Sequence, residues 1–260
     1  MSYRHNLTQL LEEINLQKPS IKIPTFVTHD LVDTYQICRL IDDFIFEYFQ
    51  ENRKTDTDIA DNRDQKIDDA LDEFQSKVVE KILKEKQDFK NISLKKKKGF
   101  KNIFEFAQCE NLYLSNKYVN LISESLGHTL EEIASISSQV FVPEKILNFK
   151  IKGVDLVVFN QGIIKYTQLK TKKDTLTGSQ SDRSINELKI HPNSVFAAAL
   201  DMGNSWTISK TKAKENNIEL LAGQAFWSML DLDYETILNK LKMTVRKIEK
   251  NFIKFSYFDV

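Results

Sequence analysis

The sequence is poor in the residues that break or cross-link a chain. Its 260 residues include seven glycines, four prolines and two cysteines. Scarce glycine and proline indicate long helices or strands with few interruptions. Cys38 and Cys109 lack the paired spacing of a zinc motif or a disulfide framework, which favours two free thiols in a reducing compartment.

Long apolar runs and an excess of one charge are also missing. No apolar run approaches the roughly 18 residues that a membrane span needs, and "MSYRHNLTQLLEEINL" lacks the apolar stretch of a signal peptide. We therefore expect a cytoplasmic protein with no membrane contact. Thirty-seven basic residues balance 37 acidic ones. This balance argues against a chain coated with nucleic-acid-binding charge, but it is compatible with a local basic groove.

Charge is nevertheless concentrated in two segments. Residues 56–73 carry eight acidic and two basic side chains, and residues 90–101 carry six lysines and no acidic residue. The second segment includes Lys95, Lys96, Lys97 and Lys98. A run of like charge is usually a solvated loop or helix face. The alternative is a contact with the DNA backbone, because clustered lysines displace counterions from phosphates.

Apolar periodicity predicts helices alone before about residue 125, and a mixture of strands and helices after it. Residues 28–54 and 65–89 have apolar side chains at helical spacing, and a long basic amphipathic helix is predicted over about 233–250. A short helix is predicted over 128–140, ended by Pro143, and another helix is predicted to begin near Pro192 and to include 194–202. Strands are predicted over 145–151, 154–159, 163–171, 206–210 and 218–222.

Together these elements predict an α+β protein in three parts. Residues 1–125 form a helical region for recognition or dimerisation, residues 126–231 form a mixed-sheet α/β core, and residues 232–260 form a C-terminal helix and tail. Within the core, Asn160-Gln161-Gly162 is expected to join two strands in a hairpin.

The hairpin carries a group of polar side chains that could bind a metal. Side chains alternate along a strand, so Gln168 and Lys170 share one face of the second strand. Asp155 is expected to lie opposite residues 167–169 and therefore close to both. Carboxylate and amide oxygens suit Mg²⁺, and a lysine beside them can orient or help deprotonate an attacking water. The alternative is an ordinary surface pair of Asp155 and Lys170, which contributes little energy.

The charge around Asp155 is unusual for a structural hairpin. Residues 145–173 contain seven lysines and a single acidic residue, which is Asp155. A structural ribbon normally mixes both signs of charge. A lone carboxylate among lysines is what a metal-containing cleft for a polyanion would show. This pattern favours a phosphate-facing site over the surface pair.

Three short motifs resemble the PD-(D/E)xK nuclease superfamily. They are "GVD" at 153–155, "QLK" at 168–170 and, upstream, the helical "GHTLEEIA" at 127–134. The resemblance covers about residues 127–225 and implies a restriction-endonuclease-like core that uses Mg²⁺. It implies that Asp155 and the main-chain carbonyl of Leu169 bind the metal, that Glu131 (or its neighbour Glu132) and Gln168 assist, and that Lys170 positions the nucleophilic water. The departure is Gln168, which stands where an acidic residue is usual and removes one negative charge from the metal site.

Residues 168–206 look like those of a type II restriction endonuclease, of the ApaLI-like group. This likeness implies hydrolysis of phosphodiester bonds in a specific duplex DNA sequence by a homodimer, because a palindromic site needs two readers related by two-fold symmetry. The basic residues expected to contact DNA are Lys172, Lys173, Arg183 and Lys95 to Lys98. Two alternatives stay open: an Mrr-like modification-dependent or repair endonuclease, and a non-catalytic protein that binds DNA or a partner.

Overall fold

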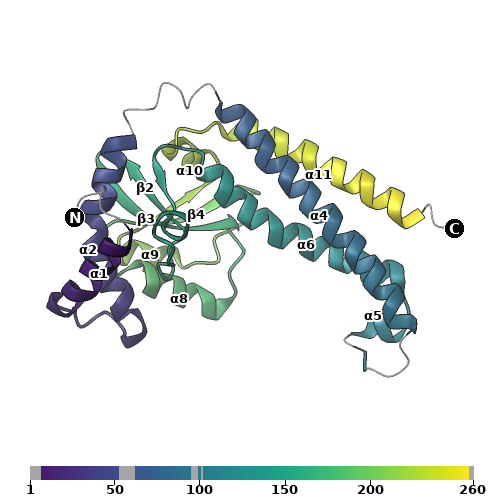
Figure 1. Ribbon diagram of the computed structural model, residues 1–260, viewed down its shortest axis with the longest axis horizontal. Coiled ribbons are helices and arrows are strands. Elements are labelled where there is room, and N and C mark those ends of the chain that lie inside the picture. Colours follow the sequence, from purple (N-terminus) through teal and green to yellow (C-terminus); the bar gives the residue numbers. More distant parts are fainter. Residues whose placement is uncertain (1–6, 53–61, 95–98, 101, 258–260) are drawn as a thin grey trace. The chain divides into compact units, whose positions relative to one another are not determined.

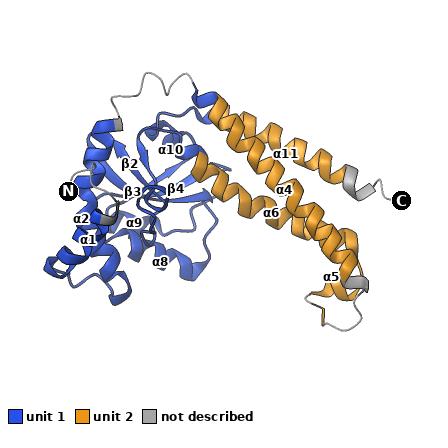
Figure 2. Cartoon of the chain, in the orientation of Figure 1, with its two compact units in different colours: residues 1–64, 133–234 blue, residues 65–132, 235–260 orange. Residues whose placement is uncertain are grey.

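The structure is a computed structural model that describes residues 7–52, 62–94, 99–100 and 102–257 (Figure 1). The chain divides into two compact units, each made of two sequence segments (Figure 2). Unit 1 comprises Met1–Asp64 and Ile133–Tyr234, and unit 2 comprises Gln65–Glu132 and Glu235–Val260. This partition differs from the linear one expected from the sequence, because residues between Leu10 and Phe49 share a core with the sheet. The α+β fold class itself is confirmed.

Unit 1 is built on a five-stranded mixed sheet with the strands in sequence order. The strands are β1 (Val140–Phe141), β2 (Leu156–Asn160), β3 (Ile163–Lys172), β4 (Ser194–Leu200) and β5 (Ile218–Ala222). Neighbours are antiparallel from β1 to β3 and parallel from β3 to β5. β3 therefore joins the two halves of the sheet, with the hairpin on one side and the parallel strands on the other.

The hairpin between β2 and β3 is confirmed. Asn160 pairs with Ile163 across a two-residue loop in which Gln161 and Gly162 have φ angles of 50° and 82°. Two positive φ angles are typical of a turn that matches the right-handed twist of the flanking strands, and glycine tolerates them best. The register places Leu156 opposite Thr167, so Asp155 comes to the level of Gln168, as predicted.

Helices from distant parts of the chain cover one face of the sheet. α1 (Leu7–Gln17) and α2 (Val32–Asn52) share a core with β1 to β3, and α8 (Gly178–Leu188) and α9 (Lys210–Glu215) share a core with β4 and β5. Tyr166 belongs to the first core and Phe196 to the second. The register pairs Gln168 with Phe196, and alternation puts Tyr166 on the same face. Figure 1 shows α1 and α2 beside β2 and β3 within this unit.

The predicted strand over 145–151 is wrong. Pro143 begins a short helix, α7 (Pro143–Leu147), instead of ending one, and Asn148 terminates it in the left-handed region at φ 56°. Proline is well suited to the first turn of a helix because it has no amide hydrogen to leave unpaired there. Within 148–151, only Ile151 pairs, in an isolated bridge with Val154. The preceding β1 was not predicted.

The helix predicted around residues 192–202 is also wrong. Residues 194–200 form β4, which is buried along its whole length. A strand buried on both faces is a continuous apolar run, and three consecutive alanines make such a run indistinguishable from a helix by periodicity. The helix of this region is α8, which begins earlier, where Thr177 and Gln180 form a reciprocal capping box.

β5 is confirmed, but the strand predicted over 206–210 is wrong. Residues 210–215 form α9, and the Ser209 side chain caps it by accepting a hydrogen bond from the Lys212 N–H. A short helix so rich in lysine has little apolar periodicity, and its serine cap is its main local signal. α10 (Gln224–Met229) follows β5 and buries Phe226 and Trp227.

Unit 2 consists of helices. They are α4 (Arg63–Leu94), α5 (Ile103–Phe106), α6 (Glu110–Ala134) and α11 (Tyr234–Tyr257), whose outermost residues at Arg63–Asp64, Ile133–Ala134 and Tyr234 count with unit 1. The helices predicted over 65–89 and 233–250 are confirmed, and the one over 128–140 overlaps the end of the longer α6. Unit 2 has a buried apolar cluster formed by Ile82, Phe89, Tyr113 and Leu114. In the described part of the chain, no helix has the length and apolar character to cross a bilayer.

Packing of α8 against the sheet can be tested with a matched pair of substitutions. Ile185 is 5 % exposed in the α8 core, whereas Ile163 at the hairpin is 45 % exposed. We expect Ile185→Val to lower the free energy of unfolding by about 0.5–1.5 kcal/mol because it removes one buried methyl group. The same change at Ile163 should cost less than about 0.5 kcal/mol. Denaturant unfolding of both variants measures the difference, and equal effects would contradict the position of α8.

Candidate active site

A polar pocket of about 260 Å³ lies in unit 1 beside the start of β2 and the second half of β3. It is lined by Gly153, Asp155, Gln168, Lys170, Leu176, Gln180, Arg183, Ser184 and Glu187. The first four come from the hairpin and its approach, and the last four come from α8. Four residues that the sequence predicted for the site therefore line the same pocket: Asp155, Gln168, Lys170 and Arg183.

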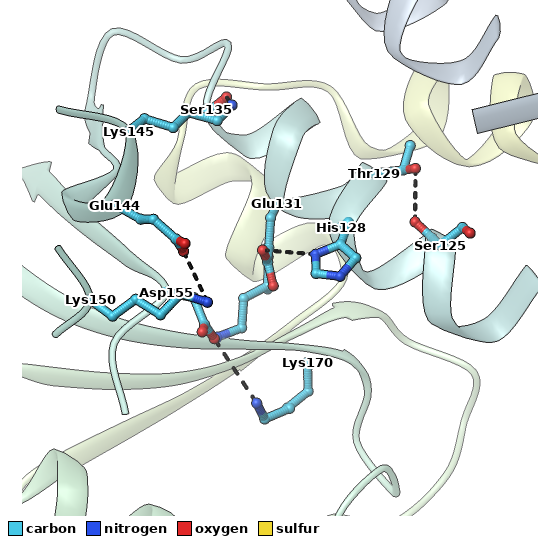
Figure 3. Close-up of polar contacts among 11 residues, drawn as sticks. Ser125, His128, Thr129, Glu131, Ser135, Glu144, Lys145, Lys150, Asp155 and Lys170 are labelled. Atoms are coloured by element: carbon cyan, nitrogen blue, oxygen red, sulfur yellow. Dashed lines mark hydrogen bonds and ion pairs between the residues drawn. The ribbon is translucent and has the colours of Figure 1, made fainter. Parts of the chain in front are cut away.

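Asp155 is held by the main chain of β3. Its N–H donates a hydrogen bond to the Thr167 carbonyl at 3.0 Å, and its carboxylate Oδ2 accepts one from the Leu169 N–H at 2.8 Å. The Lys170 ammonium nitrogen lies 4.0 Å from the same Oδ2 (Figure 3). The main chain thus fixes the carboxylate and leaves the lysine at the outer limit of an ion pair.

The environment of Asp155 opposes its negative charge. Burial raises the pKa of this carboxyl above its ordinary value, and the neighbouring Glu187 carboxylate raises it further. Lys170, the Leu169 N–H and Lys150 lower the pKa without cancelling the effect of burial. Lys150 itself pairs with Glu144 at 3.3 Å (Figure 3). A cation bound at Asp155 would favour the charged form.

Gln168 provides a second oxygen for a cation. The residue is 6 % exposed, and its Oε1 is buried without a hydrogen-bond partner within the described structure. A buried amide oxygen in this state has lost its hydration with nothing to replace it. In an extended strand, the N–H and C=O of one residue point to the same side, so the Leu169 carbonyl faces the side of β3 on which Asp155 lies.

These oxygen donors fit Mg²⁺, which binds a few protein oxygens and keeps several waters. Asp155, Gln168 and the Leu169 carbonyl are hard donors of this type. No group of three His, Cys, Asp or Glu side chains gathers anywhere in the described residues. A site built here would therefore use amide and carbonyl oxygens besides carboxylates.

α8 adds an ion pair that was not predicted. The Arg183 Nε donates a hydrogen bond to Glu187 Oε1 at 2.7 Å, and Glu187 is 5 % exposed whereas the Arg183 side chain is 69 % exposed. The spacing of Gln180, Arg183, Ser184 and Glu187 is helical and could have revealed both the helix and its polar face.

Glu131 belongs to unit 2, where it lies near the end of α6. Its carboxylate is 3.8 Å from His128 Nδ1 (Figure 3), and Glu132 follows it on the same helix. Because Glu131 and Asp155 lie in different units, a role for Glu131 in metal binding stays a prediction, as does the choice between Glu131 and Glu132.

The structure describes only some of the lysines that are expected to contact DNA. Lys172 pairs with Asp174 at 3.2 Å, and Lys173 pairs with Asp201 at 2.6 Å. Each cation is therefore partly neutralised by a neighbouring carboxylate in this structure. Lys95 to Lys98 lie outside the described residues. DNA contact by all of these residues stays a prediction.

A buried aromatic pair lies next to the pocket along β3. The Tyr166 ring stacks on His191 with 4.1 Å between the centroids, and its hydroxyl donates a hydrogen bond to Asp42. Burial lowers the pKa of His191 to about 3, so the imidazole is neutral at ordinary pH. The pair packs β3 against the segment that follows α8.

Comparison with known proteins adds no assignment. No protein-family model matches the sequence, and no match was found among curated proteins or solved structures. A function for this chain therefore has to be argued from the pocket.

The raised pKa of the Asp155 carboxyl predicts a pH-dependent gain in stability when this charge is removed. Above the raised pKa of the folded protein, the Asp155 charge disfavours folding, and this penalty disappears as the pH falls through that pKa. We expect Asp155→Asn, in buffer with a chelator, to raise the thermal midpoint at pH 7, with the gap closing toward pH 4. Asp182→Asn, at a carboxylate 62 % exposed, is the control. If Asp155→Asn instead lowered the midpoint at pH 7, burial would not dominate the energetics of this carboxylate.

Proposed function

We propose that this protein is a Mg²⁺-dependent endonuclease that cuts duplex DNA, of the type II restriction class. The observation that carries the proposal is the convergence of Asp155, Lys170 and the unpartnered buried oxygen of Gln168 in one polar pocket. A surface ion pair explains neither the buried amide oxygen nor the main-chain bond to the carboxylate. Oxygen donors beside a lysine are suited to metal-assisted attack on a phosphodiester.

In the proposed reaction the protein holds the metal and the water. Asp155, the Leu169 carbonyl and Gln168 would hold Mg²⁺, which supplies charge to polarise a phosphate and to acidify water when bound. Lys170 lies within 4.0 Å of Asp155. Its ammonium would orient the attacking water, favour loss of the water proton to solvent by stabilising the resulting hydroxide, and stabilise the negative charge that develops on the phosphate oxygens.

Two basic side chains in the pocket support a polyanionic substrate. Lys170 and the exposed Arg183 both line it. Arginine is suited to bidentate contact with phosphate or guanine. We further propose a homodimer on the DNA, because a palindromic site requires two identical readers.

The proposal predicts that cleavage depends on Lys170. Purified protein with plasmid DNA and Mg²⁺ should give discrete fragments, and Lys170→Ala should slow cleavage by about 100-fold or more, since it removes the group that stabilises developing charge. Lys165→Ala is the matched control, because Lys165 lies on the same strand, pairs with Glu219 at 2.7 Å and does not line the pocket. Fragment yield over time on gels measures both variants.

Three other results would redirect the proposal. Cleavage of only methylated or branched DNA would assign an Mrr-like modification-dependent or repair nuclease. DNA binding without cleavage, indifferent to Mg²⁺ and to Asp155→Asn, would assign a non-catalytic binding protein. Equal random nicking by the wild type and Lys170→Ala would overturn the nuclease interpretation of this pocket.

A further inference from the structure

The polar face of α8 closes the candidate active site from the side opposite to β3. Gln180, Arg183, Ser184 and Glu187 line the pocket, whereas Ile185 and Leu188 of the same helix belong to the apolar core of β4 and β5. A surface helix normally turns its polar face to solvent. Here part of that face lines the pocket that the motif residues define and brings a carboxylate to it.

Glu187 lies against the turn that precedes Asp155. A Cβ built on Gly153 would come within 2.4 Å of Glu187 Cβ and 2.9 Å of Glu187 Oε2. Gly153 also has a φ angle of 77°, which disfavours other residues there. Gly153, the glycine of "GVD" two residues before Asp155, therefore leaves room for the Glu187 side chain.

The Glu187 carboxylate is buried beside a largely exposed cation. Glu187 is 5 % exposed, and its partner Arg183, whose side chain is 69 % exposed, donates a hydrogen bond to Oε1. A buried carboxylate normally requires a cation or several hydrogen bonds. The buried Gln168 Oε1, which also lines this pocket without a partner in the described structure, is an independent observation that points to a cation as the ligand.

We propose that Glu187 supplies the second carboxylate of the divalent-metal site, opposite Asp155, and that Arg183 is its counter-ion when the metal is absent. The inference rests on the proposed function, since both use the same pocket. It accounts for Gln168: the negative charge that the hairpin strand lacks at this position comes from the crossover helix instead.

Metal binding tests the assignment without reference to cleavage. Mn²⁺, which accepts the same oxygen ligands as Mg²⁺, is titrated into the full-length protein and followed by calorimetry and by electron paramagnetic resonance of the free ion. We expect Glu187→Gln to weaken Mn²⁺ binding by at least about 10-fold and Glu187→Asp to weaken it less, because the charge remains on a shorter side chain. Arg183→Gln should strengthen binding, because it removes the competing cation.

Asp182→Asn is the matched control for Glu187→Gln. Asp182 lies on the same helix, but its carboxylate pairs with Lys212 and does not line the pocket. We therefore expect no change in Mn²⁺ affinity. Thermal unfolding in chelator identifies any variant that fails to fold, and Glu187→Asp then carries the test.

The outcomes separate this inference from the nuclease proposal. Loss of Mn²⁺ binding in Asp155→Asn together with unchanged affinity in Glu187→Gln and Glu187→Asp would overturn the role of Glu187 and leave the proposed function standing. A wild-type protein that binds no Mn²⁺ and cuts no DNA would overturn both. Parallel weakening by Asp155→Asn and Glu187→Gln, with Asp182→Asn unchanged, supports the two-carboxylate site.

Discussion

The register of the β2–β3 hairpin is the constraint on which the candidate site depends. Gln161 and Gly162 close a two-residue loop with positive φ angles and so fix Leu156 opposite Thr167. This pairing brings Asp155 to the level of Gln168 and lets the Leu169 N–H bind its carboxylate. Because side chains alternate, a slip of one residue would turn Gln168 and Lys170 to the opposite face. The geometry of the turn thus determines which polar side chains meet at the other end of the hairpin.

The parallel half of the sheet completes the pocket that the hairpin begins. A strand–helix–strand connection between parallel neighbours is almost always right-handed, and here it carries α8 over the face on which Gln168 and Phe196 lie. The apolar side of α8 is buried against β4 and β5, which positions its polar side at the pocket. Packing of the core and arrangement of the polar residues are therefore consequences of one helix orientation.

Sequence patterns predicted the parts of this structure whose local signals agree. The hairpin has both strand alternation and turn residues, and α4 and α11 have long amphipathic periods, so these elements were found. β4 was mistaken for a helix because Ala197, Ala198 and Ala199 are buried on both faces and show no period of two. That error placed the helix of this region after the true α8 and concealed Glu187. The packing of residues before 65 on the sheet depends on long-range contacts that no local pattern encodes.

The interleaved connectivity has a consequence for the order in which the chain can fold during synthesis. α1 and α2 leave the ribosome first, yet the apolar surface that they cover includes Phe141, Val157 and Tyr166, which follow only after the whole segment 65–132. Apolar side chains that are buried in the folded protein, such as Ile41 and Ile45, must therefore remain exposed to solvent until the hairpin emerges. Contacts this distant in sequence form late and leave apolar surface exposed in the meantime. The amino-terminal helices are thus an integral layer of the sheet unit, and a shortened chain that begins at the core would lack part of its own interior.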